Sequence, residues 1–234
     1  MAERIWHPPS FGKPLERSPF DKGIPLRTNI FQFQDDPRFT VREFKYDYDQ
    51  FAGIRTGKNF PKKIKGFFDE LRDTYSINVP VHFVVANNPK GRKCIYVITD
   101  VVKPQNLSTL SVDEKQKFQK QYGKLLNGLL KYLIHKFEKK ERFLEEIMPV
   151  LHDKDIWQYV YGKKEGDTDD RIYLVDTDLF IARPGKWALE DAAAQLNGSI
   201  QQAKDDYNIV GLEPLLKECL ALQSRIEGTM TKKK

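Results

Sequence analysis

Short alternating segments and one helical stripe define the first part of the chain. Residues 28–33 and 39–46 alternate apolar and polar side chains on either side of a polar turn, which predicts a β-hairpin. From residue 60 to residue 75 the period changes, because apolar side chains return every three or four positions. That spacing places them on one face, so we expect a helix over residues 60–75 with Asn59 as its cap.

Two further strands and a polar link follow this helix. Residues 79–86 form an apolar run, and residues 94–99 form another after a loop that contains Pro89 and Gly91. Such runs are typical of buried strands that are joined by a turn. Residues 100–111 are polar, so they predict a connecting segment.

The second half of the chain is mainly helical in its pattern. A strong amphipathic stripe predicts one long helix, and two short apolar segments on either side of an acidic stretch predict a pair of short strands. In order, we expect helices over residues 118–137 and 142–148, strands over residues 158–161 and 172–176, and helices over residues 189–207 and 212–226.

This order of elements favours an α+β fold over a doubly wound parallel sheet, with a sheet-rich N-terminal lobe followed by a helix-rich C-terminal lobe. We expect an extended, proline-rich arm over residues 1–23. A sheet-rich lobe with one helix is expected over residues 24–102, and a helix-rich lobe with a short strand pair over residues 103–234. A chain of 234 residues can bury a core of its own without disulfides or structural metals.

Cysteine use and apolar runs indicate the compartment. Cys94 and Cys219 lie far apart and in no metal-binding spacing, so we expect a reducing environment. The first residues lack the apolar run of a signal peptide, and the longest apolar stretch, residues 125–134, is interrupted by Lys131 and too short to cross a bilayer. These features predict a cytoplasmic protein without a membrane partner.

The formal net charge is +6, and basic side chains gather in several segments. A basic surface attracts the phosphates of nucleotides or nucleic acids, although lysines on helix faces also serve solubility. Phe and Tyr lie between the lysines of residues 62–68 and 115–122, where they could stack on bases. The same aromatics fit the apolar stripes of two predicted helices, so we expect them in the core and keep nucleic-acid binding as an alternative.

Several common catalytic sequences are absent from the chain. It contains neither GxxxxGK[ST] nor GxGxxG for phosphate binding, and neither GxSxG nor HExxH for hydrolysis. Its four histidines are scattered. His82 lies in an apolar strand and reads as a core residue, whereas His135 lies off the apolar stripe of its helix and is expected in solvent.

The strongest candidate for chemistry lies between residues 151 and 178. Asp153 precedes a predicted strand, and Asp176 comes directly after the apolar residues of the next one. A carboxylate at a strand end is held rigidly and can bind a hard cation such as Mg²⁺, and a loop carboxylate can accept a proton from a hydroxyl. A simpler interpretation also fits, in which Asp153 caps a turn, Asp176 pairs with a basic residue, and the acidic residues 165–170 form a solvated hairpin tip.

This arrangement resembles the protein-kinase-like superfamily. There, a loop aspartate is followed five residues later by a metal-binding asparagine, and a hydrophobic strand ends in a second metal-binding aspartate. The resemblance implies that Asp153 is the loop aspartate, that Gln158 occupies the asparagine position, and that Asp176 is the second metal ligand. It also implies that Arg42 replaces the phosphate-binding lysine and that Glu70, on the following helix, is the ion-pair partner of Arg42.

The chain departs from the family pattern at several points. No glycine-rich loop precedes the first strand, the lysine and asparagine positions hold Arg42 and Gln158, and Thr177 and Asp178 replace a Phe-Gly pair. The resemblance therefore implies a domain that binds ATP and Mg²⁺ as an atypical phosphotransferase or a pseudokinase, and it leaves open whether phosphoryl transfer occurs. The alternatives are a nucleic-acid-binding domain and a protein-interaction domain whose partner docks on residues 188–227.

Overall fold

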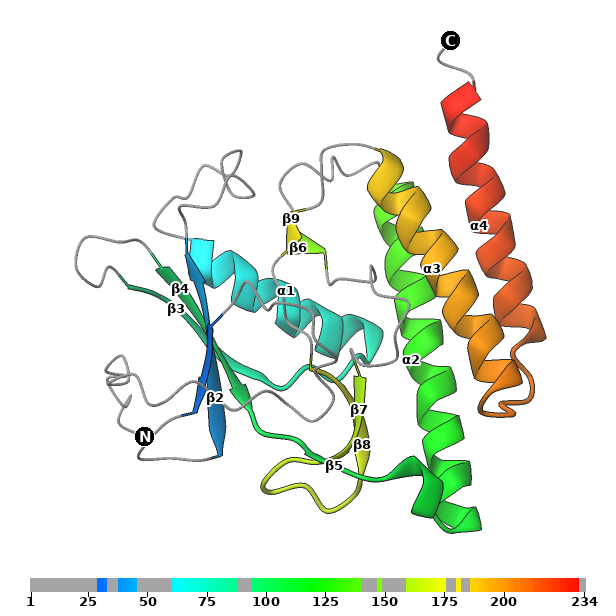
Figure 1. Cartoon of the computed structure of the whole chain (residues 1–234). Coiled ribbons are helices and arrows are strands. Elements are labelled where there is room, and N and C mark those ends of the chain that lie inside the picture. The colour runs from blue at the N-terminus through cyan, green and yellow to red at the C-terminus, as the bar shows by residue number, and fades with distance from the viewer. Residues whose placement is uncertain are drawn as a thin grey trace. The chain divides into compact units, whose positions relative to one another are not determined.

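The protein combines small antiparallel sheets with long helices in an α+β fold (Figure 1). The computed structural model describes residues 29–32, 38–45, 60–87, 94–139, 147–148, 159–175, 180–181 and 186–231, and the expected arm over residues 1–23 lies outside them. The chain divides into two compact units. Unit 1 takes Met1–Lys65, Pro80–Val101 and Lys164–Gly166, and unit 2 takes Gly66–Val79, Val102–Lys163 and Asp167–Lys234.

Unit 1 contains a four-stranded antiparallel sheet in the order β1-β2-β4-β3. Its strands are β1 (Asn29–Gln32), β2 (Phe39–Lys45), β3 (Val81–Asn87) and β4 (Cys94–Asp100). The hydroxyls of Thr40 and Thr99, which are directly opposite in the β2–β4 ladder, lie 2.7 Å apart and share a hydrogen bond. Backbone bonds from Asp100 to Pro80 and from Val101 to Arg38 fix the end of β4.

The helix α1 (Phe60–Tyr75) has the bounds that the sequence periodicity predicts. Ser76 ends it in the left-handed conformation, with a φ of 58°, which is a common way for a helix to stop. The N–H of Ile77 then donates to the carbonyl of Leu71 at 3.0 Å. Leu71, Tyr75 and Ile77 are all buried, so the end of α1 is fixed by hydrogen bonding and by packing together.

Unit 2 contains a three-stranded antiparallel sheet in the order β5-β7-β8 and a two-stranded pairing of β6 with β9. These strands are β5 (Lys103–Pro104), β6 (Ile147–Met148), β7 (Tyr159–Lys163), β8 (Arg171–Leu174) and β9 (Phe180–Ile181). Gly162 allows β5 to approach β7 closely. A Cβ added at Gly162 would lie 2.9 Å from the carbonyl carbon of Lys103 and 3.1 Å from the Cα of Pro104.

The helix α2 (Val112–Glu138) starts with a capping box. The Ser111 hydroxyl accepts a bond from the Glu114 N–H, and the Glu114 carboxylate accepts one of 2.8 Å from the Ser111 N–H. From there the helix buries a continuous apolar stripe, which makes it the central element of this core. The stripe consists of Phe118, Tyr122, Leu125, Leu126, Leu129, Leu130, Tyr132 and Leu133.

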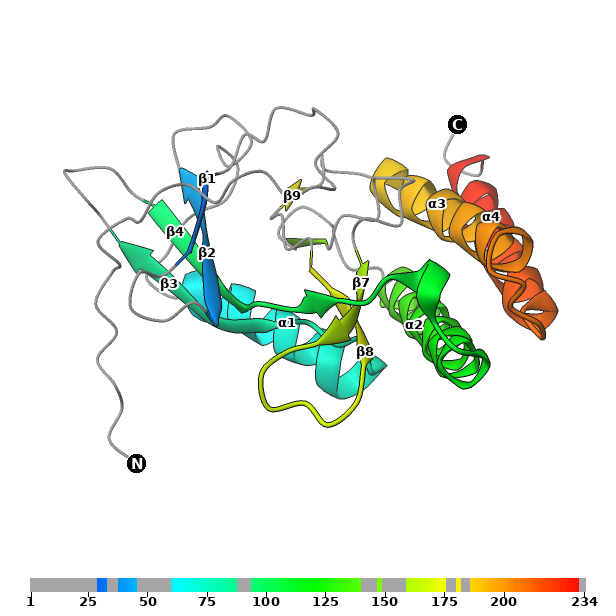
Figure 2. The ribbon, with the colours of Figure 1, turned by 60° about the horizontal axis from the view of Figure 1, so that its bottom comes forward.

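The helices α3 (Lys186–Asp205) and α4 (Glu213–Thr231) run side by side with α2 (Figures 1 and 2). Asn208 and Gly211 adopt positive φ values of 51° and 78° in the connection between them, which lets the chain reverse. Buried apolar side chains such as Ile200 and Leu222 fill the space between the helices. Cys219 is fully buried there as a free thiol, and its Sγ donates to the carbonyl of Ala193 at 3.5 Å.

The structure confirms most elements that the periodicity predicts. The first hairpin, α1, the next two strands, the β7–β8 pair and the last two helices all form, with bounds that differ by a few residues. The long helix begins at Val112 rather than at residue 118, because its first two turns carry few apolar side chains and depend on the capping box. The aromatics Phe68, Phe118 and Tyr122 are buried, as expected from their positions on the stripes.

Three local expectations were wrong. Residues 147–148, expected at the end of a helix, form strand β6, because they pair with β9 far along the chain. The link over residues 100–111 contains strand β5. His135 is half-buried rather than solvated, and its ring lies 6.1 Å from the ring of Tyr75 in an edge-to-face contact.

Candidate functional site

The structure describes two of the five residues that the kinase resemblance selects. Asp153, Gln158 and Asp176 lie outside the described residues. Arg42 lies in β2 of unit 1, where its backbone pairs with β1 on one side and with β4 on the other. Glu70 lies in the part of α1 that belongs to unit 2, and its side chain is half-buried.

Two ladders of unit 2 flank the stretches of sequence that carry the predicted carboxylates. In the first ladder Met148 pairs with Phe180, and in the second Tyr159 pairs with Leu174. The sequence between Met148 and Tyr159 contains Asp153 and Gln158, and the sequence between Leu174 and Phe180 contains Asp176. The residues that flank the first stretch, Met148 and Tyr159, are therefore paired with the residues that flank the second, Phe180 and Leu174.

The free edge of β8 is satisfied by two side chains and one backbone group. Gln121 of α2 donates to the carbonyl of Asp170 at 2.8 Å and accepts from the N–H of Ile172 at 3.0 Å. Asn78 donates its side-chain amide to the carbonyl of Ile172 at 3.1 Å, and its carbonyl accepts from the N–H of Leu174 at 2.9 Å. These bonds fix β8, the strand that precedes Asp176 in the sequence. The side chains of Ile172, Tyr173 and Leu174 in this strand are buried.

The loop between β7 and β8 is less solvated than the sequence suggests. Asp167 accepts a hydrogen bond from the Tyr173 hydroxyl and is half-buried, and half-buried Asp170 accepts one of 3.3 Å from Gln105. The expected solvated tip is correct for Gly166 and Asp169, which are exposed, and wrong for these two carboxylates.

The tip of the same loop, Lys164–Gly166, belongs to unit 1 and makes two ion pairs with other residues of that unit. Lys164 lies 2.7 Å from Asp100, and the side chain of Asp100 is only 17% exposed. Glu165 lies 3.5 Å from Arg38, and both of these side chains are well exposed. The first pair is therefore the better candidate for a contribution to stability, because exposed pairs contribute little.

A polar cleft of about 740 Å³ lies in unit 2. It is lined by α2, by the β7–β8 hairpin and by the segment that follows α1. Its lining residues are Ser76, Asn78, Glu114, Lys117, Gln121, Lys124, Leu125, Tyr161, Lys163, Asp169, Asp170, Arg171 and Ile172. The sequence interpretation missed this cleft, because its residues come from three segments that lie far apart along the chain.

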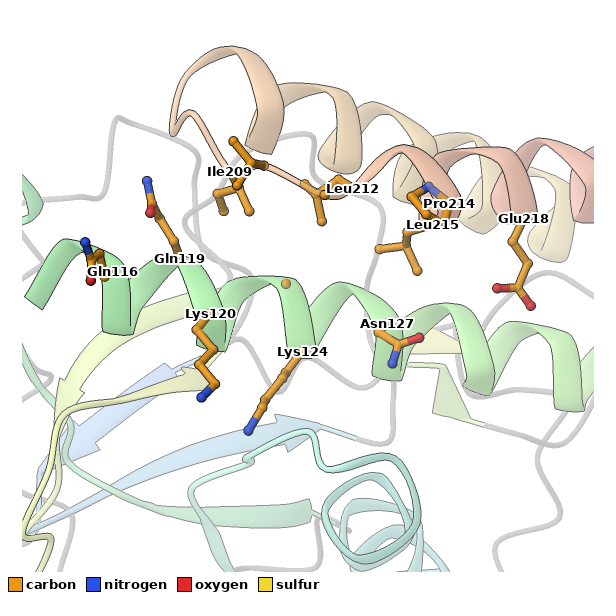
Figure 3. Close-up of a pocket in the computed structure, with 13 residues that line it drawn as sticks. Gln116, Gln119, Lys120, Lys124, Asn127, Ile209, Leu212, Pro214, Leu215 and Glu218 are labelled. Atoms are coloured by element: carbon orange, nitrogen blue, oxygen red, sulfur yellow. The ribbon is translucent and has the colours of Figure 1, made fainter. Parts of the chain in front are cut away.

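A second hollow of about 570 Å³ lies between α2 and the connection from α3 to α4 (Figure 3). Ile209, Leu212 and Leu215 form its apolar part, and Val210 beside them is 90% exposed. Figure 3 shows that Lys120 and Lys124 both project from the side of α2 that faces away from α4. Lys124 lines the polar cleft as well, so this lysine borders both hollows.

An aromatic cluster packs next to the polar cleft, and Tyr161 belongs to both. The ring of Phe118 lies 5.4 Å from that of Tyr161 and 5.4 Å from that of Tyr207, and it stacks on Tyr122 at 5.7 Å. Burial raises the pKa of Tyr122 and that of Tyr207 above the ordinary value for tyrosine, so both phenols stay neutral at physiological pH. The cluster is therefore part of the core.

The described residues contain neither a metal cluster nor a membrane helix. Among them, no three His, Cys, Asp or Glu side chains gather in a way that could hold a metal ion. None of the helices in the described part of the chain is both long and apolar enough to cross a bilayer. No model of a known protein family matches the chain, and no curated protein matches it significantly.

Proposed function

We propose that the chain is a nucleotide-binding domain of the protein-kinase-like type, which takes ATP together with Mg²⁺. The observation that carries the proposal is the pair of ladders in unit 2. Because Met148 pairs with Phe180 and Tyr159 pairs with Leu174, the segments with Asp153, Gln158 and Asp176 share both of their anchoring points. A shared metal and phosphate site needs such a meeting of a loop and a strand end.

The order of elements in the first half of the chain gives further support. Arg42 lies in β2, α1 with Glu70 follows it in the chain, and β4, which pairs with β2, is followed by the link over residues 101–111. This is the order that the resemblance implies for the phosphate-binding strand, the helix with its ion-pair partner and the strand before the hinge. In this proposal Arg42 binds phosphate oxygens as a planar, permanently charged guanidinium.

The proposed metal ligands fit a hard cation by their chemistry. The carboxylate of Asp176 and the amide oxygen of Gln158 are oxygen donors, which Mg²⁺ prefers. When bound, Mg²⁺ neutralises phosphate charge during transfer. Asp153 is the proposed base, because it lies five residues before Gln158 and a carboxylate there can accept the proton of a hydroxyl nucleophile.

Thermal stabilisation by ATP tests nucleotide binding directly. Melting of the wild-type chain is measured with ATP and Mg²⁺, with ATP and a chelator, and with Mg²⁺ alone. A ligand that binds only the folded state stabilises it by an amount that grows with the logarithm of its concentration. We expect ATP and Mg²⁺ together to raise the melting temperature, and Asp176→Asn to remove most of that increase.

The matched control is Asp169→Asn, which removes one exposed carboxylate from the loop between β7 and β8 of the same hairpin. It should keep the full response to ATP and Mg²⁺. If the wild type shows no shift at millimolar ATP, or if Asp176→Asn and Asp169→Asn respond alike, the proposal is wrong. Phosphoryl transfer is tested separately with Asp153→Asn, which should keep the ATP shift and lose any release of ADP.

A further inference from the structure

Four lysines form a straight row on the exposed side of α2, which we name the basic ridge: Lys117, Lys120, Lys124 and Lys131. All four side chains are exposed. Lys117, Lys124 and Lys131 are seven residues apart, and each heptad returns to the same side of a helix with a drift of only about 20°. At 1.5 Å per residue the ridge is about 21 Å long.

The ridge is not explained by the stability of the helix itself. Lys120, Lys124 and Lys131 have no Asp or Glu three or four residues away in either direction. Lys120 and Lys124 are four residues apart, a spacing at which like charges on a helix repel and destabilise it. Among the described residues, none of the four lysines lies within 4 Å of a carboxylate.

The polar cleft beside the ridge has one cation more than it has carboxylates, because Lys117, Lys124, Lys163 and Arg171 line it together with Glu114, Asp169 and Asp170. Each of its three carboxylates already accepts a hydrogen bond, and the ammonium of Lys163 donates to a carbonyl at 3.0 Å. The acceptors are Glu114, bonded to Ser111, Asp169, bonded to Thr168, and Asp170, bonded to Gln105. The cleft cations that make no ion pair or hydrogen bond among the described residues are Lys117, Lys124 and Arg171.

We infer that the basic ridge and the adjoining cleft bind the phosphodiester backbone of a nucleic acid. A row of about 21 Å is as long as about six nucleotide steps of one strand measured along a duplex axis, at 3.4 Å for each step. The ridge offers ammonium groups, which act as point charges toward phosphate and require no fixed orientation of the ligand. Three aromatics of α2, Phe118, Tyr122 and Tyr132, are buried and cannot stack on bases, so we expect the ridge to contact phosphates and not to read bases.

Nucleic acid fits the ridge better than an acidic peptide does. A phosphodiester strand carries a charge at every nucleotide and so matches a row of cations that is interrupted only by Asn127 and Gly128 between Lys124 and Lys131. A peptide partner would also need sites for its apolar side chains, and the side chains of Lys120 and Lys124 point away from the apolar part of the second hollow, although both residues help to line that hollow (Figure 3).

The test measures binding of a mixed-sequence single-stranded oligonucleotide at several salt concentrations. For five contacts, from the four lysines and Arg171, the slope of log K against log salt is about −3.5 for a single strand. The double variant Lys117→Gln and Lys124→Gln removes two of these contacts and should reduce the slope to about −2.1. Glutamine keeps the helix propensity of lysine, and circular dichroism checks that both proteins are folded.

The matched control is the double variant Lys139→Gln and Lys217→Gln, which removes the same charge from two exposed positions off the ridge. It should bind with the slope of the wild type. Absence of oligonucleotide binding at low salt, or an equal loss in both double variants, would overturn the inference. Polyglutamate that binds as tightly as the oligonucleotide and loses affinity equally with Lys117→Gln and Lys124→Gln would reassign the surface to an acidic protein. ATP with Mg²⁺ is the separate probe of the nucleotide site, so either proposal can fail alone.

Discussion

The side-chain oxygen of Gln121, on α2, accepts a hydrogen bond of 3.0 Å from the N–H of Ile172, on β8. The nitrogen of the same amide donates to the carbonyl of Asp170 at 2.8 Å. One glutamine thus replaces two of the backbone partners that a neighbouring strand would supply. This contact joins the helix with the basic ridge to the strand that leads to Asp176.

Removing this amide should destabilise the protein by about 1–3 kcal/mol, because two backbone groups beside a buried strand lose their partners. We expect Gln121→Ala to show the full effect in a chemical denaturation experiment. Gln121→Glu keeps an acceptor for Ile172 but places a carboxylate oxygen against the carbonyl oxygen of Asp170, so it should also be destabilising. Gln116→Ala, at an exposed position of the same helix, is the control and should be near neutral. Equal values for Gln121→Ala and Gln116→Ala would show that the bridge contributes nothing.

The contact of α2 with the end of α1 gives a second prediction. A Cβ at Gly128 would run into the carbonyl oxygen of Tyr75 and lie 3.2 Å from Cγ1 of Ile77. Gly128→Ala should therefore destabilise the protein by about 1–3 kcal/mol, since both neighbours are buried and one is backbone. Gly123→Ala is the matched control on the same helix, where the nearest atom is 3.9 Å away. It should stabilise the protein by up to about 1 kcal/mol through helix propensity. Chemical denaturation measures the free energy of unfolding of both variants. Equal values for Gly128→Ala and Gly123→Ala would show that the close approach at Gly128 does not affect stability.

Sequence periodicity predicts the elements that carry their own pattern. The stripe of α1 and the alternation of β1 and β2 are local signals, so these elements appear with nearly the expected bounds. Strands β5 and β6 have only two residues each and exist because a distant strand pairs with them. No local pattern can reveal such strands.

Some features of the candidate surfaces could likewise be predicted from the sequence, and others could not. The lysines of the basic ridge are visible in the sequence, yet the helix that places them on one side, and the absence of a carboxylate within 4 Å of them among the described residues, are known only from the structure. The signal for that start, Ser111 followed three residues later by Glu114, is present in the sequence and could have placed it correctly. The role of Gln121 could not be predicted, because its partners lie about fifty residues further along the chain.

The capping box of α2 should make stability depend on pH. Hydrogen bonds from Ser111 lower the pKa of Glu114 below its ordinary value of 4.5. A folded-state pKa that is lowered contributes stability above the unfolded pKa and loses it as the pH falls through the folded one. Glu114→Gln should therefore be less stable than the wild type at pH 7, and the difference should shrink below pH 4.5.

Urea denaturation of both proteins from pH 7 to pH 3 measures this difference. Glu227→Gln, at an exposed position of α4, controls for the general loss of one charge and should show a smaller pH-dependent difference. Ser111→Ala should cost about 1 kcal/mol at neutral pH, as is usual for loss of an N-cap. A pH-independent difference for Glu114→Gln would contradict the role of the charged carboxylate.

Cys219 should be unreactive in the native protein. Its side chain is fully buried between α3 and α4, and burial raises the pKa of its thiol to about 11. Because the thiolate is the reactive form, both effects suppress alkylation at pH 8. In a Cys94→Ala background, which leaves Cys219 as the single thiol, labelling should proceed at the rate of unfolding and become fast in denaturant. Fast labelling under native conditions would show that the α3–α4 interface opens freely.

The two ion pairs at the β7–β8 tip should differ in strength. Lys164 and Asp100 lie 2.7 Å apart with side-chain exposures of 35% and 17%, whereas Arg38 and Glu165 lie 3.5 Å apart with exposures of 48% and 66%. Solvent screens the second pair more strongly, and its longer distance weakens the direct attraction. A double-mutant cycle on Lys164 and Asp100 should give a coupling of about 0.5–1 kcal/mol.

The same cycle on Arg38 and Glu165 serves as the matched control and should give a coupling near zero. Each cycle uses Gln for the cation and the corresponding amide for the carboxylate, so that shape is kept while charge is removed. Raising the salt concentration should reduce the Lys164–Asp100 coupling only partly, because Asp100 is mostly shielded from solvent. If the more exposed pair couples more strongly, the burial of Asp100 costs as much as the attraction returns. The backbone bonds of Asp100 and Val101 then hold this end of β4 more than the ion pair does.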